Sequence, residues 1–244
     1  MTVTSGQSRR READNAATQA GVWLWTLKTI ITFLLMTLVL FVSRGRWDWV
    51  EGWIFLGLFG FLQTVLSRLL ARRSPDLLAE RSHIQAETKS WDKPLVVLQA
   101  IVFPLICLIV SGLDLRFGWG APVSVAIQLA ALGIMLLGYG LTAWAMLVNR
   151  FFSATVRIQS ERDHSVVSSG PYRFVRHPGY LGAILFQLAT PLFLGSWWGV
   201  VPAVLSLPVH VIRAALEDRT LRGELPGYRE YVETVRFRLF PGVW

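Results

Sequence analysis

Between two strongly apolar regions lies the stretch Gly170-Pro171-Tyr172-Arg173-Phe174-Val175-Arg176-His177-Pro178-Gly179-Tyr180. Gly-Pro and Pro-Gly are turn dipeptides, so we expect the backbone to bend at both ends and to hold these side chains near one another. An anchor at the lipid headgroups would account for the arginines and tyrosines. It would not account for His177-Pro178 or for the two bracketing turns. We therefore interpret the stretch as part of a functional site beside a membrane.

The composition is that of an integral membrane protein. Of the 244 residues, 53% are hydrophobic and 16% are charged, and the mean hydropathy is +0.45. Soluble domains carry roughly a quarter charged residues, and several apolar runs here are long enough to cross a bilayer. The residues before Gly21 are polar and include three arginines, so we expect no cleavable signal peptide. Residues 1–21 are predicted to form a disordered cytoplasmic tail.

The positive charges alternate with the apolar runs. The net charge is +8, and 20 of the 24 Lys and Arg fall in residues 1–21, 68–93, 150–176 and 213–238. The positive-inside rule places these segments in the cytoplasm. Because topology explains the excess of positive charge, no nucleic-acid partner is predicted. The single cysteine, Cys107, rules out an internal disulfide.

Four membrane spans are predicted before residue 149, over residues 23–42, 53–70, 94–113 and 123–148. Ser74-Pro75-Asp76 has the cap, the proline and the acid of a helix start, which predicts an interfacial helix near 74–90. Gln63 is expected to join neighbouring helices. Gly138-Tyr139-Gly140 favours close helix packing. The alternative is a close approach of a cofactor to the backbone, which no strand-turn-helix context supports here.

The last apolar region, residues 181–212, has two possible arrangements. Its legs, 181–194 and 200–212, are both shorter than the span of about 20 residues that crosses a bilayer. A single broken helix would put Arg213 outside, against the charge bias. A helical hairpin would return Arg213 to the side of His177, and we favour it. We predict an all-α membrane bundle of about five transmembrane elements, the last a hairpin over 179–212. A cytoplasmic cofactor pocket is expected between the 149–180 loop and the C-terminal tail, so that residues 149–244 form the catalytic region.

The polar residues of this predicted pocket limit its chemistry. The four histidines are scattered along the chain, so no metal site is predicted. No phosphate-binding loop and no nucleophile elbow occurs in the sequence. Arg213 and Glu217 are four residues apart and share a helix face, which suits either a surface ion pair or a functional pair beside the membrane. Such a pocket could hold a polar cofactor above a cavity that lipids reach.

A set of motifs occurs together in the last hundred residues. They are Gln159, His164-Ser165-Val166-Val167, Gly170-Pro171-Tyr172-Arg173, Arg176-His177-Pro178-Gly179-Tyr180-Leu181-Gly182, Arg213-x-x-x-Glu217-Asp218 and Arg236-Phe237-Arg238-Leu239-Phe240-Pro241-Gly242. In combination they resemble the isoprenylcysteine carboxyl methyltransferase family and, more distantly, the phospholipid N-methyltransferases, over roughly residues 145–244. The short spacer from Gln159 to His164 and the acid Asp218 depart from the family's pattern. The first half of the chain is similar in topology only.

The resemblance implies an integral membrane methyltransferase that uses S-adenosylmethionine and a lipophilic acceptor arriving from the bilayer. Carboxyl O-methylation is the favoured reaction. Carried over by position, the resemblance implies that Arg213 holds the acceptor's carboxylate, with Arg213 and Glu217 as the catalytic residues. The implied cofactor contacts are Gln159, His164, Ser165, Val166, Val167, Tyr172, His177, Pro178, Gly179, Tyr180 and Glu217.

Other functions stay open at this point. The acceptor could be a lipid amine, or a phenol or quinone-like molecule. A membrane reductase would need a phosphate-binding cluster, for which only Arg173 and Arg176 are available. A lipid-binding or transport protein without chemistry would need polar residues at the bilayer midplane, where we find only Gln63. The expected partners are membrane lipids and a lipophilic small molecule, without nucleic acid or metal. The expected location is the cytoplasmic membrane of a bacterium, with the site facing the cytoplasm.

Overall fold

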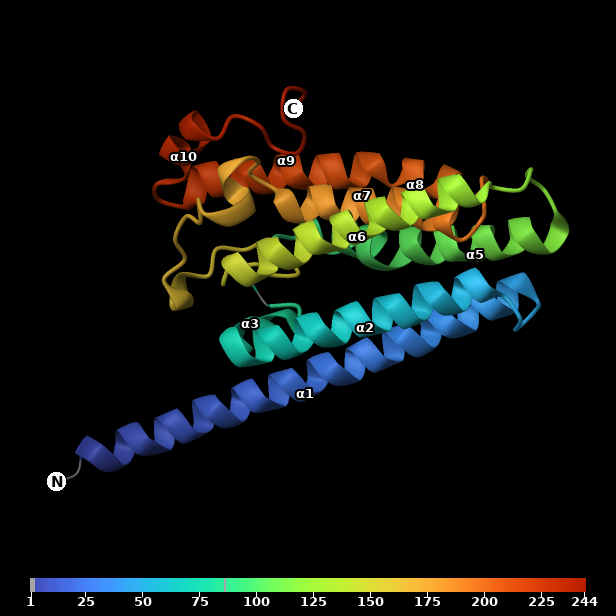
Figure 1. Ribbon diagram of the computed structural model, residues 1–244. Coiled ribbons are helices and arrows are strands. Elements are labelled where there is room, and N and C mark those ends of the chain that lie inside the picture. Colours follow the sequence, from blue (N-terminus) through green and yellow to red (C-terminus); the bar gives the residue numbers. More distant parts are fainter. Residues whose placement is uncertain (1–2, 86) are drawn as a thin grey trace.

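The computed structural model describes residues 3–85 and 87–244, and all regular structure in that range is helical (Figure 1). Five stretches are long and apolar enough to cross a membrane, at 18–44, 50–73, 92–117, 125–148 and 200–224. The predicted all-α membrane bundle is therefore confirmed. The elements are α1 (Val3–Arg44), α2 (Val50–Arg73), α3 (Pro75–Arg81), α4 (Asp92–Val97), η1 (Leu98–Val102), α5 (Phe103–Phe117), α6 (Val125–Val148), η2 (Ser160–Arg162), η3 (Gly170–Arg173), α7 (Pro178–Phe193), α8 (Val200–Leu205), α9 (Leu207–Glu224) and α10 (Tyr228–Thr234).

Helix α1 corrects the prediction of a disordered tail over residues 1–21. The helix begins at Val3, so the described part of that tail is helical, while residues 1 and 2 lie outside the described residues. Residues 3–20 contain no proline, and they include four alanines and three arginines, which favour helix. Because adding residues to an existing helix is much easier than nucleating one, the first span extends into this segment.

The third span and the interfacial helix also differ in detail from the prediction. Helices α4, η1 and α5 form one run, in which η1 is a π-helix. Pro104 lies two residues after the end of η1, and its missing N–H and bulky ring favour the wider turn. Helix α3 ends at Arg81 instead of near residue 90. There the Ser82 hydroxyl donates to the carbonyl of Ala79 at 2.7 Å and competes with the next helical turn.

The predicted hairpin is confirmed. Helix α7 runs away from the 149–177 segment, and α8 and α9 return alongside it (Figure 1). At the returning end, the Tyr180 hydroxyl of α7 donates to Glu217 of α9 at 2.7 Å. At the far turn, the Ser196 hydroxyl donates to Asp114 of α5 at 2.6 Å. A single broken crossing is thereby excluded, because both legs share the end that carries Glu217.

Glycines bring α6 and α7 into close contact. A Cβ atom on Gly138 would lie 2.6 Å from the carbonyl oxygen of Gly182, and one on Gly182 would lie 2.5 Å from that of Gly138. Only residues without a side chain fit this crossing, so the packing interpretation of Gly138 is confirmed. Next to it, the Tyr139 hydroxyl donates to Gln63 of α2 at 3.1 Å. Gln63 therefore joins two helices, as predicted.

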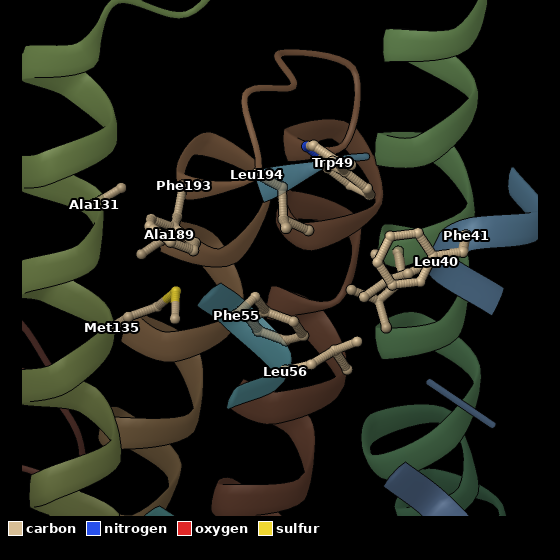
Figure 2. Close-up of a cluster of buried hydrophobic side chains, with 11 residues drawn as sticks. Leu40, Phe41, Trp49, Phe55, Leu56, Ala131, Met135, Ala189, Phe193 and Leu194 are labelled. Carbon is tan, nitrogen blue, oxygen red and sulfur yellow. The ribbon is translucent and has the colours of Figure 1, made fainter. Parts of the chain in front are cut away.

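A buried apolar cluster closes the end of the bundle that lies away from α3 and α10 (Figures 1 and 2). Leu40 and Leu194 are fully buried, and Phe55 and Leu56 are nearly so. The links from α1 to α2, from α5 to α6 and from α7 to α8 lie at this same end (Figure 1). We call it the outer end. The cluster comprises Leu40, Phe41, Trp49, Phe55, Leu56, Leu108, Ala131, Met135, Ala189, Phe193 and Leu194.

Candidate active site at the inner end of the bundle

A cavity of about 500 Å³ lies between the helices and reaches the inner end of the bundle, where α3, the 149–177 segment, the second half of α9 and α10 meet. One part of its wall is polar and comes from residues 149–180 and from α9. The other part is largely apolar and comes from the membrane helices, with Met36 of α1, Phe55 and Phe59 of α2, Leu108 of α5 and Phe186 of α7. A volume of this size suits a small-molecule ligand. The cavity therefore combines a polar wall with an apolar wall from the membrane helices.

Most of the site residues predicted from the sequence line this cavity. Gln159 and Pro178 do not. Gln159 is 1% exposed, and its amide is used inside its own loop. Its Nε2 donates to the Phe151 carbonyl at 2.8 Å, and its Oε1 accepts from Arg162. Pro178 is the first residue of α7, where no N–H is needed. The residues that line the cavity are His164, Ser165, Val166, Val167, Tyr172, His177, Gly179, Tyr180, Arg213 and Glu217.

Glu217 offers a negative charge to the cavity. Its Oε2 accepts a hydrogen bond from the Tyr180 hydroxyl at 2.7 Å. Among the described residues, no Lys or Arg forms an ion pair with it. A carboxylate with spare acceptor positions beside a cavity can bind a cationic ligand.

Arg213 is already paired in the structure, with a residue that the sequence argument missed. Its Nε and Nη2 donate to the two oxygens of Asp92 at 2.6 and 3.1 Å. Nη1 donates to Gln99 at 3.0 Å, and Nη2 also donates to the carbonyl of Ala154 at 2.7 Å. Asp92 is fully buried. An acid at the start of an apolar span is itself a signal that a cation lies nearby.

Asp218 anchors the C-terminal tail beneath the site. It is fully buried and accepts from Nε of Arg176 at 2.7 Å, from Nε of Arg238 at 3.1 Å and from the hydroxyl of Tyr228 at 3.1 Å. The ring of His177 approaches it, with Nε2 at 3.5 Å, which is too long for a good hydrogen bond. These contacts explain why Arg176 and the 236–242 motif occur together. Their role is to fold the tail onto the 170–180 stretch.

The backbone of the 170–180 stretch is fixed to the same tail. The N–H of Arg176 donates to the carbonyl of Phe237 and that of His177 to the carbonyl of Arg238, both at 2.9 Å. Gly170 has a φ of +58°, which supplies the first predicted bend. The first predicted bend is confirmed, but Pro178 and Gly179 are the first residues of helix α7 and do not form the second predicted turn.

A buried arginine attaches the loop before the site to α3. Arg157 donates to both oxygens of Glu80 at 2.9 Å and also pairs with Glu161 and Glu87. The hydrogen bonds with Glu80 raise the pKa of Arg157 above its usual value. Its neighbour Arg162 pairs with Asp76 of the same helix. Helix α3 is thus part of the site's framework.

Burial also changes the protonation of groups on the cavity wall. It lowers the pKa of His164 to about 4, and the charges of Arg162 and Arg157 add to the effect. The His164 ring packs on Phe151, with centroids 4.5 Å apart, and its Nδ1 accepts from the N–H of Gln159 at 3.3 Å. Burial raises the pKa of Tyr172 well above its usual value. His164 is therefore neutral at pH 7.

Gln187 is a polar residue in the apolar helix α7, and the sequence argument missed it. It lies on α7, lines the cavity and is 9% exposed, and its Nε2 has no hydrogen-bond partner among the described residues. Within residues 3–85 and 87–244, no group of three His, Cys, Asp or Glu side chains is placed to hold a metal ion.

Comparison with known proteins identifies the part of the chain that carries the site. Residues 131–222 match the model of the isoprenylcysteine carboxyl methyltransferase (ICMT) family. This part of the chain is similar to the ICMT family. It includes most of α6, all of α7 and α8, and α9 as far as Arg222. The family resemblance inferred from the motifs is confirmed, and Arg213, Glu217 and the 164–180 contacts all lie within the match.

Relatives of known name are similar over parts of the chain. A protein-S-isoprenylcysteine O-methyltransferase of Schizosaccharomyces pombe is 38% identical over 71 residues, which is 29% of this chain and 30% of the relative. One of Saccharomyces cerevisiae is 30% identical over 145 residues, 58% of this chain and 57% of the relative. A probable one of Oryza sativa is 38% identical over 45 residues, 18% and 24% of the two chains.

The chain thus covers less than two thirds of the length of these relatives. All of them are eukaryotic, so they give no support to the expected bacterial membrane, while the membrane location itself stands.

Proposed function

We propose that the protein is a methyltransferase that uses S-adenosylmethionine and methylates the carboxyl group of a lipophilic acceptor at the inner end of the bundle. One observation carries the proposal: a single cavity is lined both by the ICMT motif residues and by apolar residues from membrane helices. The relatives are named as isoprenylcysteine O-methyltransferases, which supports an acceptor with an isoprenyl-like chain and a carboxylate. The membrane half of the cavity suits the chain, and the polar half suits the carboxylate.

The residues of the polar half fit the proposed cofactor. S-adenosylmethionine, when bound, supplies a methyl group made electrophilic by its sulfonium. Glu217 would attract the positive charges of the cofactor, since no ion pair among the described residues competes for this carboxylate. Residues 164–168 have no regular secondary structure, so their backbone N–H and C=O groups could bind the polar groups of the ligand. Tyr172 and Tyr180 add aromatic walls.

The acceptor needs little acid or base assistance if it arrives as a carboxylate, because that group is already a nucleophile. The chain's task is then to align it and to keep water away. Well-oriented reactions gain roughly 7–11 kcal/mol from such positioning. The apolar wall removes water from the nucleophile. Arg213 would orient a carboxyl oxygen through the Nη1 side of its guanidinium, which donates to the neutral Gln99.

Calorimetry tests the cofactor. S-adenosylhomocysteine should bind the purified protein with one site, and methyl transfer from labelled S-adenosylmethionine should follow when lipophilic acids are added. Amines and phenols of matched chain length form the comparison set. Saturable binding of a nicotinamide dinucleotide in place of S-adenosylhomocysteine would instead favour the reductase.

Arg213 tests the acceptor. Arg213→Lys keeps the charge and loses the planar fork, so turnover should fall far more than cofactor affinity. Asp92→Asn is the matched control, because it disturbs the same ion pair without removing the guanidinium. Robust methylation of a neutral amine or phenol by Arg213→Ala would refute the carboxyl assignment and leave the methyltransferase proposal intact.

A further inference from the structure

Four arginines line the cavity, and they differ in whether an acid neutralises their charge. Three of them form buried ion pairs, Arg157 with Glu80, Arg176 with Asp218 and Arg213 with Asp92. Within residues 3–85 and 87–244, no acid lies within ion-pair distance of the fourth, Arg81. Arg81 is partly buried, and removing a charge from water without a partner is costly, so the lack of an acid beside it needs an explanation.

Arg81 is enclosed by aromatic rings at the end of α3. Its guanidinium carbon lies 5.5 Å from the ring centre of Trp25 on α1 and 5.4 Å from that of Phe152. Nη1 donates to the carbonyl of Phe152 at 3.0 Å. Nε is buried and has no hydrogen-bond partner among the described residues. The packing therefore fixes the side chain but leaves donors unused.

The acids near Arg81 are committed to other partners. On its own helix, Asp76 pairs with Arg162 and Glu80 pairs with Arg157. At the start of α4, Asp92 holds Arg213. Burial lowers the pKa of Arg81 to about 10, and the charge of Arg213 adds to this effect. Arg81 is still protonated at neutral pH, so it presents a full positive charge that the surrounding protein does not neutralise.

We propose that Arg81 is the carboxylate-binding residue of the cavity, and that it holds the carboxylate of the acceptor beside Arg213. The assignment rests on the proposed function. A planar guanidinium with free N–H groups matches a carboxylate in two-point geometry. Arg213 is neutralised by Asp92, so Arg81 supplies the charge that distinguishes an acid from a neutral analogue. Arg81 lies outside residues 131–222, which the family match covers.

The carboxylate that Arg81 binds could belong to the acceptor or to the cofactor, because the amino-acid part of the cofactor also ends in a carboxylate. The location of Arg81 beside the first membrane span favours the carboxylate of the acceptor. Arg81 contacts Trp25 of the first span, and next to it Lys28 of that span donates to the carbonyl of Ser82 at 2.6 Å. A lipid acid in the membrane part of the cavity, which Thr32 and Met36 of the same span line, would meet this residue as it moved toward the polar half.

The experiment compares Arg81→Gln with Arg81→Lys, and uses Arg73→Gln, an exposed arginine at the end of α2, as the matched control. The probes are S-farnesyl-cysteine acid, its uncharged carboxamide, S-adenosylhomocysteine and 5′-methylthioadenosine, which lacks the amino-acid part. Binding is measured directly, so the result does not depend on turnover. Thermal unfolding in the same detergent reports whether each variant folds.

We expect Arg81→Gln to weaken binding of the acid about tenfold or more, a range typical of hydrogen bonds to a charged group. The carboxamide should bind the Arg81→Gln variant and the unchanged protein equally well. Arg81→Lys should recover part of the affinity for the acid. A loss confined to S-adenosylhomocysteine, with 5′-methylthioadenosine unaffected, would still support carboxylate binding and would name the cofactor as the source. If each of the four probes bound Arg81→Gln with the same affinity as the unchanged protein, the proposal would be overturned. Failure of the unchanged protein to bind S-adenosylhomocysteine would count against the proposed function alone.

Discussion

The two ends of the bundle each bury a carboxylate, and they satisfy it in different ways. At the outer end, Asp114 is 3% exposed, and the donors to its side chain among the described residues are all neutral. These are the N–H of Gly120 at 2.8 Å, the hydroxyl of Ser196 at 2.6 Å and the N–H of Trp198 at 3.2 Å. At the inner end, Asp218 accepts from Arg176 and Arg238. The outer arrangement ties two loops together, and the inner one concentrates charge beside a cavity.

The difference indicates where the molecule keeps groups available for ligands. The apolar cluster packs against the outer end, and Asp114 there meets three donors from the chain. Buried nitrogens without a hydrogen-bond partner among the described residues occur at both ends. Arg44 at the outer end does not line the cavity, whereas Arg81, His177 and Gln187 do. Buried polar groups are normally paired, so such exceptions are candidates for ligand contacts. Stability and binding are thus assigned to opposite ends, and variants at each end test that assignment.

The largest effect is expected from Asp218→Asn. It would leave Arg176 as a buried charge without its partner, which typically costs about 3–5 kcal/mol. The unfolding temperature in detergent should fall sharply, and the C-terminal tail should become sensitive to protease. The control is Asp48→Asn, which breaks an exposed pair with Arg46 and should leave the unfolding temperature unchanged. A similar small change in both variants would mean that the inner network adds little to stability.

Glu217→Gln should affect binding and leave stability nearly unchanged. The amide keeps the size and the contact with Tyr180 but removes the negative charge. We expect the affinity for S-adenosylhomocysteine to fall about tenfold, about 1.4 kcal/mol, as is typical for the loss of one charged contact. Glu224→Gln is the control, since this acid lies on the same helix, half-exposed and paired with Lys89. Equal affinities in the two variants would remove Glu217 from the cofactor site.

The sequence predicted the outer framework better than the contacts inside the cavity. Apolar length, charge bias and turn dipeptides are local, so they were enough to predict the spans, the hairpin and the side on which Glu217 lies. The Asp92–Arg213 pair joins residues 121 positions apart, and no spacing rule connects them. Gln159 was assigned by motif alone, and its amide turned out to bond within its own loop. Arg81 looked like one more positive-inside charge, because the absence of a partner shows only in three dimensions.

His164 should make the inner end sensitive to acid. Its pKa in the folded protein, about 4, lies below its ordinary value of about 6.5. Between these values the unfolded chain binds a proton that the folded chain does not, so stability is complete above pH 6.5 and falls as the pH drops toward 4. Unfolding temperatures at pH 7.5 and pH 5 measure this. In His164→Gln, the difference in unfolding temperature between the two pH values should be smaller. In His83→Gln, at an exposed position, this difference should be unchanged.

The smallest effect on the cavity is expected from Ser196→Ala at the outer end. The hydroxyl donates to Asp114 and accepts from the N–H of Gly199 at 2.9 Å, so its removal leaves one buried N–H without that partner. Asp114 keeps its two backbone donors, and the loss of stability should therefore be about 1 kcal/mol. Affinity for S-adenosylhomocysteine should not change, because no residue of this turn lines the cavity. If Ser196→Ala weakened binding as much as Glu217→Gln does, the two ends would be coupled through α7, and the division between a stabilising end and a binding end would be wrong.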